Sequence, residues 1–185
     1  AFSDYDRDGD LDFYRTETRL FSIKEMFKHK VLLLKDEHGV WQAHPSQASQ
    51  FEMIDGVPRE RGTRDQLFRN EGLGANGMPK FVESTHQAGI SIAPEHGLAA
   101  VWWDYDNDHW PDLYVSNDFH TPDHLYRNNR DGTFTEVTKE ALPYTSWNSM
   151  GSDFADINND GFFDYLSTDM SATTHFKQKT MMGAM

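Results

Sequence analysis

The sequence contains no cysteine. Disulfide bonds, thiolate metal sites and cysteine nucleophiles are therefore excluded from its chemistry. It also has no run of about 18 apolar residues of the kind that crosses a bilayer, and its first residues lack the pattern of a signal peptide. We therefore expect no transmembrane segment.

Basic residues are scarce as well. The chain has 17 Lys and Arg against 30 Asp and Glu, which gives a formal net charge of −13. A phosphate backbone is bound by clustered Lys and Arg, so this balance argues against a nucleic-acid partner. Residues 15–69 carry 10 basic and 8 acidic residues, whereas the rest carries 7 basic and 22 acidic residues. The acidic excess therefore lies in the part of the chain that is built from repeats.

The chain instead has one acidic pattern that occurs three times. Asp or Asn takes the first, third, fifth and ninth positions of each copy, and apolar residues flank it. Calcium takes about 6–8 oxygen ligands, which alternate carboxylates and a backbone carbonyl at the seventh position supply from one short loop. We therefore predict about three Ca2+ ions, one in each of the loops 4–12, 104–112 and 156–164. The predicted ligands are Asp4, Asp6, Asp8, Asp10, Asp12, Asp104, Asp106, Asp108, Trp110, Asp112, Asp156, Asn158, Asp160, Phe162 and Asp164, with Asp10, Trp110 and Phe162 acting through their carbonyl groups.

Other interpretations fit these loops less well. An EF-hand has a bidentate Glu at its twelfth position and helical flanks, but the twelfth positions here are Arg15, Val115 and Ser167 and the flanks have the composition of strands. Solvated Asp-rich turns are the alternative without metal, although clustered carboxylates repel one another when no cation is bound. Magnesium is less favoured because it prefers to keep its waters. In the second loop His109 replaces the glycine at the sixth position, where φ > 0 is expected, which predicts a weaker or bent site.

Two further segments are repeated, and each forms part of a predicted hairpin. Leu67-Phe68-Arg69-Asn70 is echoed by Leu125-Tyr126-Arg127-Asn128, and the segment from Phe81 to Thr85 is echoed by that from Phe134 to Thr138. Asp131-Gly132 marks the turn between the second pair. One unit is therefore a strand, an acidic loop, a strand, a linker and a hairpin. A period of about 50 residues with four short strands is typical of β-propeller blades.

The predicted fold is all-β: a calcium-binding β-propeller fragment of about three four-stranded blades that spans residues 1–185 as one partial domain. Residues 16–66 form one long insertion, which we expect to lie inside a single unit. Its first half has either the spacing of a helix, from Leu20 to Val31, or the pattern of a hairpin, from Val31 to Ala43. A polar surface excursion is expected from His44 to Thr63. Because a closed propeller needs about 4–8 blades, we expect the chain to be a fragment.

The acidic loops, the two Leu-x-Arg-Asn segments, the segment from Asp131 to Phe134 and the segment from Met150 to Phe154 together resemble the FG-GAP (VCBS) repeat family. The resemblance is nearest to cartilage acidic protein-like and bacterial ASPIC/UnbV proteins, and it covers most of the chain outside Thr16 to Gln66. It implies a calcium-stabilised propeller, usually of seven blades and related to the integrin α-subunit head. It also implies a secreted or surface-exposed protein that binds or scaffolds, and it brings no catalytic motif.

Other possible sites carry less weight. His120 and His124 have a metal-like spacing, but Pro122 between them argues against a helix that presents both. Four tryptophans, Trp102, Trp103, Trp110 and Trp147, could form a sugar-stacking surface, although packing between blades is favoured. The sequence has no Gly-x-Ser-x-Gly, phosphate loop or zinc-protease helix.

The sequence therefore predicts a non-enzymatic, calcium-stabilised binding or scaffold protein outside the cytoplasm. Its partner would be a protein or a glycan, and the neutral-to-basic insertion is a candidate contact surface. One alternative is the propeller domain of a polysaccharide-active enzyme such as a lyase. Another is an accessory subunit of a larger membrane-associated assembly, docked through the insertion.

Overall fold

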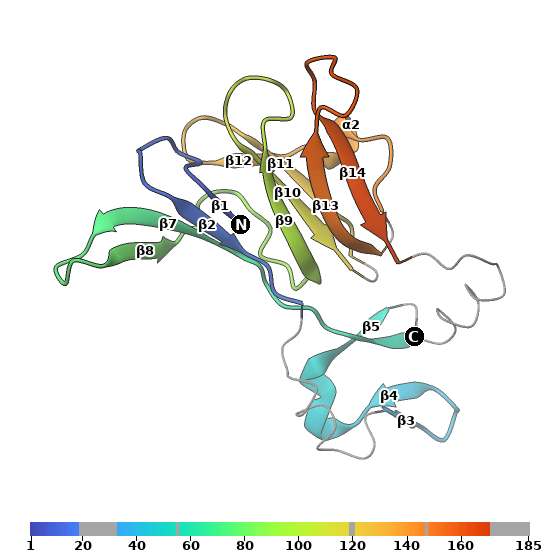
Figure 1. The fold of residues 1–185 in the computed structure, drawn as a ribbon. Coiled ribbons are helices and arrows are strands. Elements are labelled where there is room, and N and C mark those ends of the chain that lie inside the picture. The colour runs from blue at the N-terminus through green and yellow to red at the C-terminus, as the bar shows by residue number, and fades with distance from the viewer. Residues whose placement is uncertain (19–32, 55, 119–120, 147, 171–185) are drawn as a thin grey trace. The chain divides into compact units, whose positions relative to one another are not determined.

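The computed structural model describes residues 1–18, 33–54, 56–118, 121–146 and 148–170 (Figure 1). The chain divides into two compact units. One consists of residues 1–18 and 64–171, and the other of residues 19–63 and 172–185. The first unit is built from antiparallel sheets, so the prediction of an all-β fold is confirmed.

The first sheet of this unit has four strands in the order β1-β2-β7-β8. These are β1 (Phe2–Ser3), β2 (Asp12–Arg15), β7 (Gln66–Leu73) and β8 (Pro79–Glu83). The acidic loop 4–12 joins β1 to β2. Although about 50 residues separate them in the sequence, β2 and β7 are neighbours, with Tyr14 opposite Leu67. The two strands that flank the insertion are therefore paired in one sheet.

The second sheet repeats this plan in the order β12-β11-β10-β9. Its strands are β9 (Gly97–Trp103), β10 (Asp112–Asn117), β11 (His124–Asn128) and β12 (Phe134–Glu136), and β12 is followed by the short helix α2 (Thr138–Ala141). The third sheet pairs β13 (Ser149–Ala155) with β14 (Asp164–Asp169). The described residues of the first unit thus form two four-stranded sheets and one two-stranded sheet, where about three four-stranded blades were predicted. Among the described residues, the third sheet has no counterpart of the hairpins β7–β8 and β11–β12.

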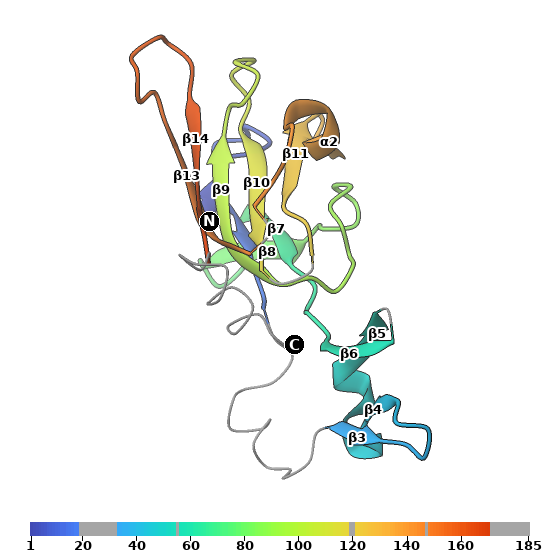
Figure 2. The same ribbon diagram turned by 90° about the vertical axis from the view of Figure 1, so that its right-hand side faces the viewer.

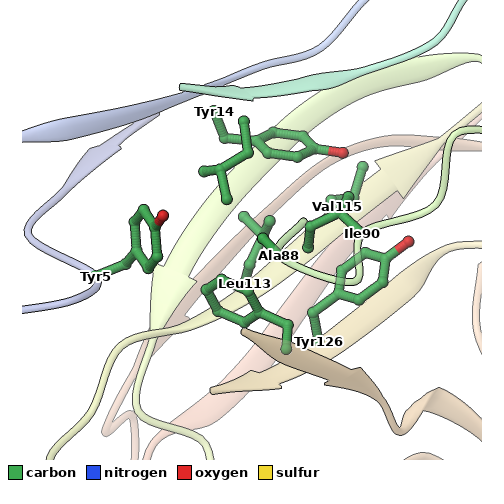
Figure 3. Close-up of a cluster of buried hydrophobic side chains, with 9 residues drawn as sticks. Tyr5, Tyr14, Ala88, Ile90, Leu113, Val115 and Tyr126 are labelled. Carbon is green, nitrogen blue, oxygen red and sulfur yellow. The ribbon is translucent and has the colours of Figure 1, made fainter. Parts of the chain in front are cut away.

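Strand β10 lies between two packed layers, and each of its six residues is buried. Leu113 and Val115 point to one side, where they meet Tyr14 from the first sheet, as Figure 3 shows. The core on this side consists of Tyr5, Tyr14, Leu67, Ala88, Ile90, Leu113, Val115, Tyr126 and Phe134. Successive side chains of a strand point to opposite faces. β10 therefore packs against a layer on each side.

On the other side of β10, Tyr114 packs with Leu125 and Val137 against Phe154 and Tyr165 of the third sheet. Strands β13 and β14 run alongside β9 and β10 in this region (Figure 2). Aromatic rings fill both contacts between sheets. Trp102 stacks on Tyr5 with ring centroids 6.0 Å apart, and Trp103 stacks on Phe154 at 3.8 Å. Packing between sheets is thus confirmed for these two tryptophans, whereas Trp147 lies outside the described residues.

The insertion has more regular structure than the sequence indicated. Its described part contains the hairpin β3 (Leu33–Lys35) and β4 (Trp41–Ala43), the 3₁₀ helix η1 (Pro45–Gln50), and a second hairpin of β5 (Phe51–Ile54) and β6 (Val57–Glu60). The predicted hairpin is confirmed from residue 33 onward, and the helical spacing from Leu20 to Val31 lies outside the described residues. The segment from His44 to Thr63, which was predicted as a polar surface excursion, contains η1 and the second hairpin, which the sequence did not indicate. Gly56, with φ of 75°, allows the tight turn that closes the second hairpin.

Candidate metal centres

The three acidic loops have the same backbone conformation. The fourth and sixth positions of each loop lie in the left-handed region, and glycine occupies the sixth position in two of them. The φ angles are 58° at Arg7, Asn107 and Asn159, and 97°, 71° and 89° at Gly9, His109 and Gly161. The expected positive φ at His109 is therefore confirmed. The left-handed fourth position was not predicted, although Asn, which tolerates it, occurs there twice.

Two loops bring together three carboxylates each. One ligand oxygen from each of Asp4, Asp6 and Asp8 lies within 4.8 Å of the others, and the same holds for Asp104, Asp106 and Asp108. These are the first, third and fifth positions of the predicted sites.

The loop 156–164 does not form such a carboxylate trio among the described residues. Asn158 takes the third position and donates from Nδ2 to Oδ2 of Asp160 at 2.9 Å. Asp156 accepts the N–H groups of Asp160 and Gly161 at 3.0 and 2.9 Å. The third loop therefore offers a less charged set of oxygens.

The aspartates at the ninth position play a different part from the other acidic residues. Asp112 is fully buried, and its two oxygens accept the N–H groups of Tyr105 at 3.0 Å and Asn128 at 2.7 Å. Asp12 is equally buried, and accepts those of Tyr5 at 3.2 Å and Asn70 at 2.8 Å. Each thus ties its own loop to the Asn of a Leu-x-Arg-Asn segment. In the third loop, Asp164 accepts the N–H of Ile157 at 3.0 Å.

The predicted carbonyl ligands occupy equivalent places. The N–H groups of Asp10, Trp110 and Phe162 donate to the fifth-position carboxylates of their loops at 2.9, 2.8 and 2.9 Å. The seventh residue is thus fixed beside the fifth, and its carbonyl role stays a prediction.

Burial and mutual repulsion make several of these carboxyl groups harder to ionise. Desolvation raises the pKa of Asp6, and the neighbouring charge of Asp8 raises it further. Desolvation also raises the pKa of Asp12 to about 6 and that of Asp112 to about 7. The backbone N–H groups that donate to these carboxylates lower the pKa, but by less than desolvation raises it. A bound dication would reverse this repulsion.

The surroundings of the first loop fit a cation. Oδ1 of Asp4 is buried and has no hydrogen-bond partner among the described residues. In the second loop, Oδ1 of Asp104 accepts the N–H of Asp108 at 2.9 Å instead. There, Arg130 donates from Nε and Nη2 to Oδ2 of Asp108 at 2.9 and 2.6 Å. The second trio thus already has a positive charge beside it.

The second and third loops lie in a segment that matches a known family. Residues 104–167 match the FG-GAP-like repeat. This FG-GAP-like repeat begins at the first aspartate of loop 104–112 and ends three residues beyond loop 156–164. No curated protein matches the chain. Within the described residues, we find no helix with the length and apolar character needed to cross a membrane.

The segment that matches this family contains a second buried arrangement, a tyrosine paired with an aspartate, which the sequence patterns did not reveal. Tyr114 donates from its hydroxyl group to Asp123 at 2.7 Å, and Asp123 also accepts the N–H of Asn117 at 2.7 Å. The first sheet has the equivalent pair, with Tyr14 donating to Asp65 at 3.1 Å. Both aspartates stand two residues before the leucine of Leu-x-Arg-Asn. Extending the comparison of the two Leu-x-Arg-Asn segments by two residues toward the N-terminus would have found these aspartates.

Proposed function

We propose that this chain is part of a calcium-stabilised β-propeller that serves as a binding or scaffold module outside the cytoplasm. The FG-GAP-like repeat at residues 104–167 supports a propeller-type binding domain. We also propose that the chain is related to cartilage acidic protein-like and ASPIC/UnbV proteins.

The calcium role rests chiefly on one observation. Oδ1 of Asp4 is buried without a hydrogen-bond partner in a trio of carboxylates that lie within 4.8 Å of one another. Buried polar atoms are rarely left unpaired, and grouped carboxylates suit a hard cation with oxygen ligands. Asp4, Asp6 and Asp8 would hold the ion in the first loop, and Asp104, Asp106 and Asp108 would hold it in the second. The ion would supply positive charge that holds each loop together.

The third loop is the weakest candidate for calcium. Asp156, Asn158 and Asp160 would hold an ion there, but Asn158 carries no charge and donates from its amide to Asp160. The sequence had instead predicted the weaker site at the second loop, because of His109. We propose that the third loop fills last.

The propeller proposal is supported by how the sheets are covered. The middle sheet packs on both faces, whereas the first sheet has a row of phenylalanines in ring contact on its other face. Phe13 stacks on Phe68 with centroids 4.6 Å apart and meets Phe81 edge-on at 4.8 Å. Phe2, on the same face, is 68% exposed. Such a face is suited to packing against another blade.

The proposed location and partner follow from the same features. FG-GAP-like repeats are typical of extracellular domains, and extracellular calcium modules bind with dissociation constants of about 10⁻⁴–10⁻³ M. We propose that the module contacts a protein or a glycan, and that the insertion at residues 16–66 is one candidate contact.

Thermal unfolding with calcium and with a chelator tests this function. An ion that binds only the folded state at about 100 times its dissociation constant contributes about 2.7 kcal/mol per site. We expect calcium to raise the melting temperature by roughly 5–10 °C for one such site, and by more for two. Melting curves that coincide in calcium and in chelator would contradict the proposal. Magnesium at the same concentration is the matched control.

A further inference from the structure

A hollow of about 570 Å³ lies beside β11, between that strand and the segment 142–145. This volume is within the range of about 300–1,000 Å³ that is usual for small-ligand sites. Its polar lining includes Ser91, His124, Tyr126 and Glu136, and its apolar lining includes Leu142 and Pro143. The acidic loops do not line it, so it is separate from the candidate metal centres.

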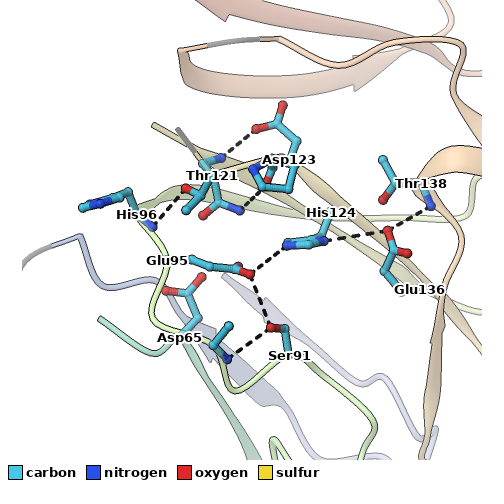
Figure 4. A network of polar contacts seen from close by, with 12 residues as sticks. Asp65, Ser91, Glu95, His96, Thr121, Asp123, His124, Glu136 and Thr138 are labelled. Carbon is cyan, nitrogen blue, oxygen red and sulfur yellow. Dashed lines mark hydrogen bonds and ion pairs between the residues drawn. The ribbon is translucent and has the colours of Figure 1, made fainter. Parts of the chain in front are cut away.

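Ser91, His124, Glu136 and Thr138 of this lining belong to one polar network with Glu95 (Figure 4). Nε2 of His124 lies 3.0 Å from Oε1 of Glu95, and Nδ1 lies 3.7 Å from Oε1 of Glu136. Ser91 donates from its hydroxyl to Oε1 of Glu95 at 3.3 Å, and Oε1 of Glu136 also accepts the N–H of Thr138 at 3.2 Å. The side chains of His124 and Glu95 are only 15% and 14% exposed. Their positions are thus set before any ligand arrives.

The titratable groups of this network lie beside one another. Desolvation lowers the pKa of His124, but hydrogen bonding and charge from Glu95 and Glu136 outweigh it and raise the pKa above its usual range. His124 thus lies beside the carboxylates of Glu95 and Glu136, and Lys139 also lines the hollow. The carboxylate of Asp123 is turned to Tyr114 and the N–H of Asn117. His124, Glu136 and Asp123 therefore already have partners within the protein, which favours an uncharged ligand in the hollow.

One wall carries a large exposed aromatic ring. Tyr144 is 83% exposed, and it lines both this hollow and a second one bounded by Tyr165, Ser167 and Asp169. An aromatic ring left in water beside fixed donors and acceptors is suited to a ligand that has both an apolar face and hydroxyl groups.

We propose that the hollow binds a neutral sugar ring. Tyr144 would cover the C–H face of the ring, and Glu136 would accept hydrogen bonds from its hydroxyl groups. Lys139 and Ser91 would supply further polar contacts. The inference gives a ligand class to the binding role proposed above and rests on that role, but not on the calcium sites.

Saturation-transfer NMR with the whole chain tests the inference. The probes are free glucose, galactose, mannose, fucose and N-acetylglucosamine at millimolar concentration, with the amides of acetylated lysine and arginine as cationic comparators. We expect transfer to at least one sugar and none to the comparators. Tyr144→Ala and Glu136→Gln should each weaken sugar binding about tenfold or more, which is a free-energy change of about 1.4 kcal/mol.

Matched controls are available on the insertion. Trp41 is an exposed aromatic residue and Glu37 an exposed carboxylate, so Trp41→Ala and Glu37→Gln should leave sugar binding unchanged. Absence of transfer to every sugar, preference for the cationic comparators, or full binding by both pocket variants would overturn the proposal. Melting curves of the same samples with and without calcium separate the two proposals, because sugar binding without a calcium shift rejects only the metal role.

Discussion

Loops 4–12 and 104–112 share one backbone conformation, yet their carboxylates have different surroundings. In the first loop Gly9 takes the sixth position, and Gly72 stands where the second sheet has Arg130. Both Gly72 and Arg130 donate their N–H to the Asn of Leu-x-Arg-Asn, at 3.0 and 2.8 Å, so they are structurally equivalent. The first trio thus has no arginine beside it at this position, whereas the second does.

The acidic residues of one loop therefore have two different roles. The buried aspartates at the ninth position form the same hydrogen bonds in both sheets, so they serve the architecture of the repeat. The first, third and fifth carboxylates are matched in position but not in charge environment. The first loop is therefore expected to depend on an external cation, while Arg130 partly replaces one in the second.

The largest effect is expected where the two loops agree. Asp12→Ala and Asp112→Ala each remove the acceptor of two backbone N–H groups, and an unpaired buried donor costs about 1–3 kcal/mol. We expect each variant to lose about 3 kcal/mol of unfolding free energy in chelator, measured by denaturant titration. Asp164→Ala, which removes the acceptor of one N–H, should lose about 1 kcal/mol. Equal losses in all three variants would show that the number of backbone N–H groups accepted does not set the contribution of the ninth position.

A smaller effect is expected where the loops differ in charge. Arg130→Ala frees the carboxylate of Asp108, so calcium affinity at loop 104–112 should rise severalfold, and the gain should shrink as salt screens the charges. The reciprocal variant Gly72→Arg should weaken calcium binding at loop 4–12. Calcium titration followed by tryptophan fluorescence measures both, with Arg61→Ala as the control. An unchanged affinity in Arg130→Ala would mean that the ion pair with Asp108 does not compete with calcium.

The smallest effect concerns the backbone at the sixth position. A side chain in the left-handed region costs roughly 1–2 kcal/mol, and the greater freedom of glycine in the unfolded chain offsets about 0.5–1 kcal/mol of this. His109→Gly should therefore stabilise the protein by about 0.5 kcal/mol. Gly9→Ala should destabilise it by a similar amount, since a Cβ there meets no atom within 4 Å and only the φ angle opposes it. Denaturant titration would contradict this account if both variants changed stability in the same direction.

Much of the fold could be predicted because its signals are local. The Asp131-Gly132 turn and the paired segments around Leu125 and Phe134 define a hairpin by turn chemistry and alternation, and that hairpin is present as β11 and β12. The insertion was harder to predict, because Phe51–Ile54 is short and its pairing with Val57–Glu60 depends on one tight turn. The position of Asp4, Asp6 and Asp8 followed from spacing alone.

The electrostatic differences between the loops could not be predicted in this way. The contact of Arg130 with Asp108 joins residues 22 positions apart across a hairpin, and the pattern of the loop does not include it. The pairing of Tyr14 with Asp65 spans the whole insertion. Such contacts depend on which strands become neighbours, and the spacing within one loop does not specify that.

Isothermal titration calorimetry of calcium into the wild-type chain, Asp4→Asn and Asp104→Asn tests the central claim most directly. The wild type should show one tighter class of site and at least one weaker class. The tighter class should disappear in Asp4→Asn and persist in Asp104→Asn, because the first trio lacks the arginine that the second has beside it. A tight class that survives Asp4→Asn, or an absence of calcium binding at millimolar concentration, would contradict the account.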